Sequence, residues 1–153
     1  MKTRFFIFIV AGLSLTNLYA QPNLDWWVGY APEVSLAAEH NLTKIDNNGN
    51  VYSVGYKEIN VLINDFDTVL LKYDSLGNLL WQQTIGGDAN ASDAISDIEI
   101  NSYGDIFVTG YIETVSGATD ILVIKYNSDG EQQWINVIDS GNGVDAAKEI
   151  AID

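Results

Sequence analysis

Few residues of this chain combine the types and the spacing that catalysis requires. His40 is the single histidine among 153 residues, and no nucleophile-elbow motif accompanies it. A Ser-His-Asp triad needs a serine beside the imidazole and a carboxylate behind it, so we predict His40 to be a surface or loop residue. The twenty-one acidic residues produce pairs by chance, and no pair stands in a motif that indicates glycoside hydrolysis.

The acidic composition invites a search for calcium ligands. Residues 46–50 (DNNGN) offer oxygen ligands at alternate positions. An EF-hand loop counted from Asp46 needs glycine at its sixth position and glutamate at its twelfth, where the chain has Val51 and Lys57. We therefore interpret residues 46–50 as a turn, and we assign no catalytic residue, cofactor site or metal site. The cluster of Asp88, Asp93 and Asp97 likewise follows no metal-binding pattern.

Two tryptophans could serve as platforms for a sugar, but they recur. Trp81 and Trp134 stand 53 residues apart in matching contexts. A binding residue need not recur in every unit, so we interpret both as core residues between units. Lys72 and Lys125 also recur at this interval, and we expect each to pair with a carboxylate on a neighbouring strand.

The elements that position these residues come in repeats of 52 to 55 residues. Residues 48–56 (NGNVYSVGY) recur as 103–111 (YGDIFVTGY), and residues 67–74 (DTVLLKYD) recur as 120–127 (DILVIKYN). Asp93-Ala94 recurs as Asp145-Ala146. Several motifs that keep one order at nearly one spacing indicate an internal repeat.

Each unit is predicted to contain four β-strands. In the first unit, residues 42–85, they span 42–46, 51–57, 68–73 and 79–85. In the second unit, residues 94–138, they span 94–100, 105–112, 120–126 and 131–138. Glycine and asparagine in the turns accept positive φ and close antiparallel hairpins. No stretch shows a sustained helical period.

The third strand of each unit indicates how the units stack. Residues 69–71 and 121–124 are apolar without alternation, which means that both faces of these strands are covered. Without helices, the cover must come from other sheets. Four-stranded antiparallel sheets stacked face to face and repeated radially form a β-propeller. A two-sheet sandwich is the alternative, although it would not require repeated motifs.

The units resemble the SBBP-type β-propeller repeats of secreted bacterial proteins over about residues 42–153. The second unit carries the pattern in Asp93-Ala94, Gly104-Asp105, Thr109-Gly110-Tyr111, Asp120, Lys125-Tyr126, Gly130 and Trp134. The first unit departs at its start, where Glu39-His40-Asn41 replaces Asp-Ala, and it has a longer loop at residues 58–66. Kelch repeats are the weaker alternative, because their double glycine is missing after Val54 and Val108. The resemblance implies an extracellular propeller and transfers no catalytic residue.

Residues 1–20 have the three regions of a secretory signal peptide. Lys2 and Arg4 form a basic start, residues 5–13 (FFIFIVAGL) form an apolar run, and Ala20 is a small residue at the cleavage position. The run is shorter than the roughly 20 apolar residues of a membrane-spanning helix. We therefore expect a secreted or cell-surface chain of residues 21–153.

Both ends of the mature chain carry partial units. Residues 24–30 align Trp26 with Trp81 and are predicted to form a lone outer strand, and residues 146–153 are predicted to begin a third unit. A propeller needs about four to eight blades, whereas the sequence holds two complete ones. We expect a fragment of a larger propeller, or a short chain that completes its ring with other copies of itself.

The composition restricts the classes of partner and site that the chain can have. The formal net charge is −14, which argues against nucleic acid and anionic membranes. The absence of cysteine excludes disulfides, thiolate metal sites and cysteine nucleophiles. We predict a non-catalytic binding or scaffolding module for a protein or glycan. The alternative is an extracellular hydrolase or lyase with its site in the central channel, where the innermost strands would place Lys44, Ser96, Asp97 and Glu99.

Overall fold

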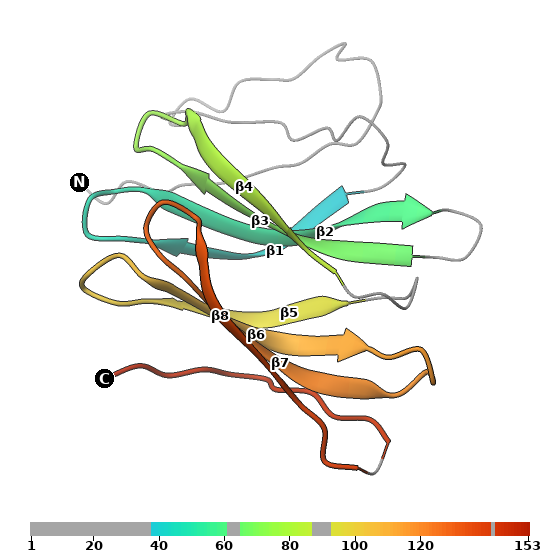
Figure 1. Ribbon diagram of the computed structural model, residues 1–153. Coiled ribbons are helices and arrows are strands. Elements are labelled where there is room, and N and C mark those ends of the chain that lie inside the picture. The colour runs from blue at the N-terminus through green and yellow to red at the C-terminus, as the bar shows by residue number, and fades with distance from the viewer. Residues whose placement is uncertain (1–37, 61–64, 87–92, 142) are drawn as a thin grey trace.

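The described residues form two separate four-stranded antiparallel sheets (Figure 1). The computed structural model describes residues 38–60, 65–86, 93–141 and 143–153. The predicted signal peptide, residues 1–20, and the predicted outer strand, residues 24–30, lie outside them. The first sheet contains β1 (Ala38–Ile45), β2 (Val51–Asn60), β3 (Asp65–Tyr73) and β4 (Leu79–Ile85) in chain order. The second contains β5 (Ala94–Ile100), β6 (Ile106–Glu113), β7 (Thr119–Tyr126) and β8 (Gln132–Ile138). The expected all-β architecture is confirmed for the described residues, which contain no helix and hence none able to span a membrane.

The first strand is longer than the sequence pattern predicts. β1 begins at Ala38, which pairs with Lys57, and it continues through His40, which pairs with Gly55. A β-bulge between His40 and Leu42 interrupts the register, and an extra residue of this kind breaks the alternation that marks a strand in a sequence. The backbone of His40 therefore lies in a strand and not in a loop.

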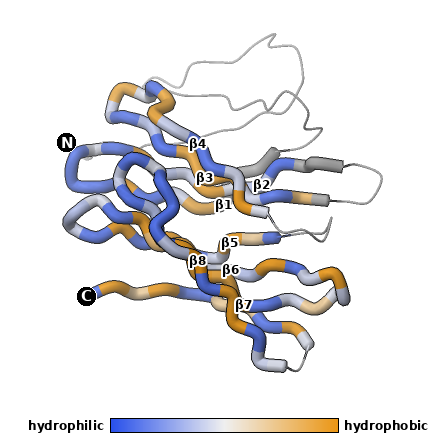
Figure 2. The backbone as a smooth tube through the Cα atoms, viewed as in Figure 1, coloured by the Kyte–Doolittle hydropathy of each residue, from blue (hydrophilic) through white to orange (hydrophobic). Residues whose placement is uncertain are grey.

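Four hairpin turns are built in the same way. Each begins with Asp or Asn, namely Asp46, Asp74, Asn101 and Asn127. A side-chain oxygen of that residue accepts hydrogen bonds from the backbone N–H groups two and four residues later, at 2.8 to 3.1 Å. The fourth residue is always glycine, with φ between 81° and 85°. Figure 2 shows that these turns are largely hydrophilic, whereas hydrophobic residues gather in the strands.

The two sheets stack face to face, and the face that the first sheet contributes is not the equivalent of the face that the second sheet contributes. The first sheet contributes Tyr52, Val54, Leu70 and Ile85 to the shared core, and the second contributes Ile98, Ile106, Val108, Leu122, Ile124 and Tyr126. The face of the first sheet that carries Tyr52, and the equivalent face of the second sheet, are called the front faces. The opposite face of each sheet, which carries Ile106 in the second sheet, is called the back face. The repeat offset places Phe107 and Val123 on the front face of the second sheet. The second sheet therefore stacks its back face on the front face of the first, which is a head-to-tail arrangement.

The back face of the first sheet carries a core of its own. Val51, Val69, Leu71 and Tyr73 are buried there in a second cluster. β3 is consequently buried on both faces from Thr68 to Tyr73, as its uninterrupted apolar run predicts. β7 is different, because Val123 on its front face stays partly exposed while Leu122 and Ile124 on its back face are buried.

The C-terminal segment, residues 143–153, lies along the second sheet (Figure 1). The Asp145 N–H donates to the Thr119 carbonyl at 2.7 Å, and the Thr119 hydroxyl donates to the Asp145 carbonyl at 2.8 Å. In the first sheet the Asp93 N–H likewise donates to the Phe66 carbonyl at 3.1 Å, and Phe66 is the counterpart of Thr119. The hydroxyl that donates to the Asp93 carbonyl, also at 3.1 Å, belongs to Thr68, two residues further along β3. Residues 145–153 thus follow the second sheet as β5 follows the first, although they form no strand ladder in the described chain.

Candidate binding groove along the first strand of each sheet

The four residues that the sequence places on innermost strands line one groove. Lys44 comes from β1, and Ser96, Asp97 and Glu99 come from β5. Residues 148–151 of the C-terminal segment complete a groove of about 540 Å³. β1 and β5 are each the first strand of a sheet, and each pairs on one side only within the described chain. The groove therefore lies where the free edges of successive units meet.

An ion pair lies within this groove. Lys44 Nζ lies 2.5 Å from Glu99 Oε1, and the two side chains are 40% and 31% exposed. The hydrogen bond that Lys44 donates to Glu99 raises the pKa of Lys44. Burial opposes this rise, and the charges of Glu99 and Asp97 add to it. Half-exposed pairs of this kind contribute about 0–1 kcal/mol to stability. Both charged groups are therefore available to a ligand at little cost to the fold.

The repeat explains why Lys44 and Glu99 meet. Lys44 is paired with Tyr52 and Glu99 with Phe107, so the two residues occupy the same position in successive units. Stacked units bring equivalent positions side by side, and opposite charges at that position attract. The sequence contained this signal, because a charge that changes sign between repeats predicts a contact between them.

Asp97 holds the C-terminal segment, which forms the third side of the groove. Its Oδ1 accepts from the Ile98 N–H at 2.9 Å, and its Oδ2 accepts from the Ile150 N–H at 3.0 Å. One carboxylate thus satisfies backbone donors on β5 and on the C-terminal segment. By its register with Val54, Leu42 occupies the equivalent position in the first unit. Its side chain cannot accept a hydrogen bond.

The recurring lysines behave differently from each other. Lys125 pairs with Asp105 at 2.8 Å, as expected for a cross-strand ion pair. Lys72 instead donates to the Ser128 carbonyl of the second sheet at 2.8 Å and lies 5.2 Å from the centre of the Tyr52 ring. Burial lowers the pKa of Lys72, and the charges of Asp46 and Asp129 only partly offset this effect. Among the described residues Lys72 forms no ion pair with a carboxylate on a neighbouring strand, contrary to the prediction, because stacking brings the turn of the next unit within its reach.

The recurring tryptophans also differ. Trp81 packs against the shared core, and its Nε1–H donates to the Ser128 carbonyl at 3.1 Å. Its indole lies so close to Gly130 that a Cβ there would be 2.7 Å from Trp81 Cδ2. Trp134 is 39% exposed. The predicted core role is confirmed for Trp81 and is wrong for Trp134 in the described structure.

Asp46 acts in a turn, as its sequence context predicts. Its carboxylate accepts from the backbone and side chain of Asn50, from the Asn48 N–H and from the Tyr52 hydroxyl. Burial alone would raise the pKa of Asp46, but these hydrogen bonds outweigh burial and lower it. The pKa of Tyr52 is raised, first by burial and then by the charge and hydrogen bond of Asp46.

One carboxylate cluster was not anticipated. Oxygen atoms of Asp120, Asp139 and Asp145 lie within 4.8 Å of one another. Burial, and then the charges of Asp139 and Asp145, raise the pKa of Asp120. Oxygen ligands of this kind suit a hard cation such as Ca²⁺. The cluster could not be predicted from the repeats, because Asp139 corresponds to Gly86 in the first unit and the three carboxylates therefore do not recur.

Comparison with known proteins gives limited similarity. No family model matches the chain. Over 82 residues the chain is 32% identical to the regulatory protein FlaEY of Caulobacter vibrioides, and the match covers 44% of this chain. The chain spans only 8% of the length of that relative. The similarity is therefore to a small part of a much longer regulatory protein.

Proposed function

We propose that this chain belongs to a secreted or cell-surface β-propeller of the SBBP type and acts as a non-catalytic binding or scaffolding module. The observation that carries the proposal is the head-to-tail stacking of the two sheets. Interfaces between unlike faces repeat in one direction, and they generate a ring when the rotation closes. The way Asp145 follows the second sheet repeats the way Asp93 follows the first, which supports the same step for a further unit.

The groove is the proposed contact site. The glycine and the Asp or Asn of each Asp/Asn hairpin turn recur in both units. Lys44, Ser96, Asp97 and Glu99 do not recur, so stacking alone does not dictate their identity. They present ammonium, hydroxyl and carboxylate groups in one groove, which suits a polar protein segment or a glycan.

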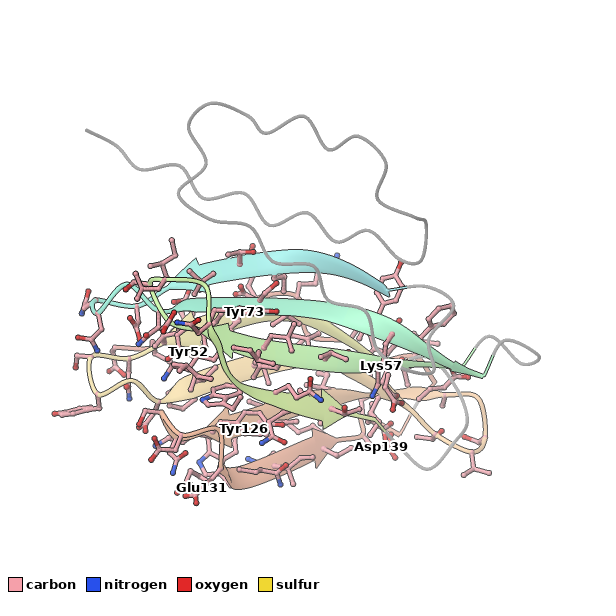
Figure 3. The ribbon with its side chains drawn as sticks, turned by 90° about the horizontal axis from the view of Figure 1, so that it is seen from above. Tyr52, Lys57, Tyr73, Tyr126, Glu131 and Asp139 are labelled. Atoms are coloured by element: carbon pink, nitrogen blue, oxygen red, sulfur yellow. The ribbon has the colours of Figure 1, made fainter. Side chains whose placement is uncertain are left out.

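Binding to glycan and peptide arrays, followed by calorimetric titration of the strongest probe, tests the proposal. Lys44→Ala should weaken binding, because it removes one charge of the groove and leaves Glu99 without its partner. Lys57→Ala is the matched control, because Lys57 bonds to Thr84 at 3.2 Å at the far end of the sheet (Figure 3). No binding, or binding that Lys44→Ala leaves unchanged, would contradict the proposal. Turnover of the bound probe would favour the propeller enzyme instead.

A further inference from the structure

A second hollow lies between hairpin turns of the two sheets. It has a volume of about 200 Å³, and its lining residues are all different from those of the groove. The β1–β2 turn lines one side and the β5–β6 turn of the next sheet lines the other, at the end of the first sheet where Figure 3 labels Tyr52. We call this hollow the turn pocket, and the argument for a ligand rests on Asn47, Asn48, Lys72, Ser102 and Tyr103 of its lining.

Lys72 places a buried ammonium group in the turn pocket. The residue is 7% exposed, and an ammonium group has three N–H donors. Among the described residues, the Ser128 carbonyl is its one hydrogen-bond acceptor, at 2.8 Å. The rings of Tyr52 and Trp81 lie 5.2 and 5.9 Å from Nζ and attract the charge through their π electrons. Because a buried donor without an acceptor is costly, Lys72 favours a ligand that brings an acceptor oxygen.

The second sheet shows that the repeat does not require this arrangement. There the equivalent Lys125 pairs with Asp105 at 2.8 Å. Asn50 takes the place of Asp105 in the first unit, since each donates its N–H to the residue that begins its turn, four positions earlier. The carboxylate of the first turn belongs to Asp46, whose oxygens accept hydrogen bonds from neighbouring residues. Within the described chain, Lys72 therefore has no counterpart of the Lys125 ion pair.

The rim of the turn pocket combines polar groups with an exposed aromatic ring. The side chains of Asn47, Asn48 and Ser102 form no hydrogen bond with the described chain, and each offers both a donor and an acceptor. Tyr103 is 87% exposed, and its ring adds an apolar face to these polar groups. A sugar is complementary to this set, because its hydroxyls both donate and accept and its C–H groups pack on an aromatic ring.

We propose that the turn pocket binds one neutral sugar unit of a glycan. A sugar hydroxyl accepts from Lys72, the amides and Ser102 bond to further hydroxyls, and the Tyr103 ring packs on the sugar. A neutral ligand is favoured over an anion, because the charges of Asp46 and Asp129 also act at Lys72 and the chain carries a formal charge of −14. The small volume limits the pocket to a single unit. This inference names a second site and does not depend on the groove.

NMR titration of the full chain with the methyl glycosides of glucose, galactose, mannose and N-acetylglucosamine tests the proposal. We expect at least one of them to shift the backbone amides of residues 47–48 and 101–103, with a dissociation constant of about 1 mM. The Trp81 indole N–H should shift as well, because it donates to the same Ser128 carbonyl as Lys72. Glucuronic acid is the anionic comparison, and we expect it to bind more weakly than the best neutral glycoside.

Two variants locate the binding site. Tyr103→Ala should raise the dissociation constant of the best glycoside about three- to tenfold. Leu76→Ala is the matched control, because Leu76 is also the third residue of an Asp/Asn turn and is 76% exposed, but lies outside the turn pocket. Lys72→Met should abolish the shifts, and the exposed position of Tyr103 keeps the test independent of any folding defect in Lys72→Met.

Three results would overturn the proposal. They are the absence of shifts at the turn pocket with all four glycosides, equal effects of Tyr103→Ala and Leu76→Ala, and tighter binding of glucuronic acid than of every neutral glycoside. Binding that Lys44→Ala weakens and Tyr103→Ala leaves unchanged would place the sugar in the groove instead. The proposal for the turn pocket would then fail while that for the groove stands, so the two can be distinguished.

Discussion

Replacing Gly130 with alanine measures how strongly the two sheets are joined at Trp81. Two glycines allow a matched comparison, because Gly130 and Gly117 occupy hairpin turns with nearly equal φ angles of 84° and 79°. A Cβ at Gly117 would meet no heavy atom within 4 Å, whereas a Cβ at Gly130 would lie 2.7 Å from Trp81 Cδ2. The difference between the two substitutions therefore isolates contact with the indole.

The expected magnitudes follow from these two environments. Gly117→Ala should cost about 1–2 kcal/mol, the strain of a left-handed residue with a side chain. Gly130→Ala adds about 1–3 kcal/mol of steric overlap, because Trp81 is held by its hydrogen bond to Ser128 and its contact with Tyr52. We expect Gly130→Ala to unfold at a melting temperature about 2–12 °C below that of Gly117→Ala.

Urea and thermal unfolding followed by circular dichroism give the two free energies. Repeating both substitutions in a Trp81→Ala background completes a double-mutant cycle. In that background the extra cost at Gly130 should disappear, because no indole remains to be displaced. Equal costs at Gly117 and Gly130 in the wild-type background would refute the close contact, and so would an extra cost that survives the loss of Trp81.

Three further predictions address the groove, its third side and the turns. Lys44→Ala should lower the free energy of unfolding by no more than about 1 kcal/mol, which urea titration at low and high salt will measure. Asp97→Asn should speed amide hydrogen exchange at residues 146–152 while β6 and β7 keep their protection, because Asp97 accepts from the Ile150 N–H; unchanged exchange would contradict its positioning role. Hydrogen bonds lower the pKa of Asp74 and of Asp46, the latter against burial, so the folded state binds fewer protons than the unfolded one at acidic pH. The free energy of unfolding should therefore fall as pH drops from about 5 through the folded pKa values, and Asp46→Asn should flatten that slope in a series of urea titrations.

Local signals allowed much of the fold to be predicted from the sequence. The Asp/Asn–x–x–Gly turns are specified within five residues, because a side-chain oxygen and a glycine at positive φ suffice to close them. Alternating and continuous apolar runs predicted the strands for the same reason, since a period of two residues is a property of one strand. The extension of β1 past His40 escaped this reasoning, because a bulge breaks that period.

Contacts between units were decided by the tertiary structure. Trp81 and Trp134 have matching sequence contexts, yet one meets Gly130 and the other is exposed. Lys72 and Lys125 differ in the same way, because only Lys72 faces the turn of a following sheet. The sequence by itself determined the repeats, the strands and the turns, since these depend on neighbouring residues. Stacking decided which copy of each repeated residue is buried and brought Lys44 to Glu99, because a sheet face acquires its environment only from the sheet placed against it.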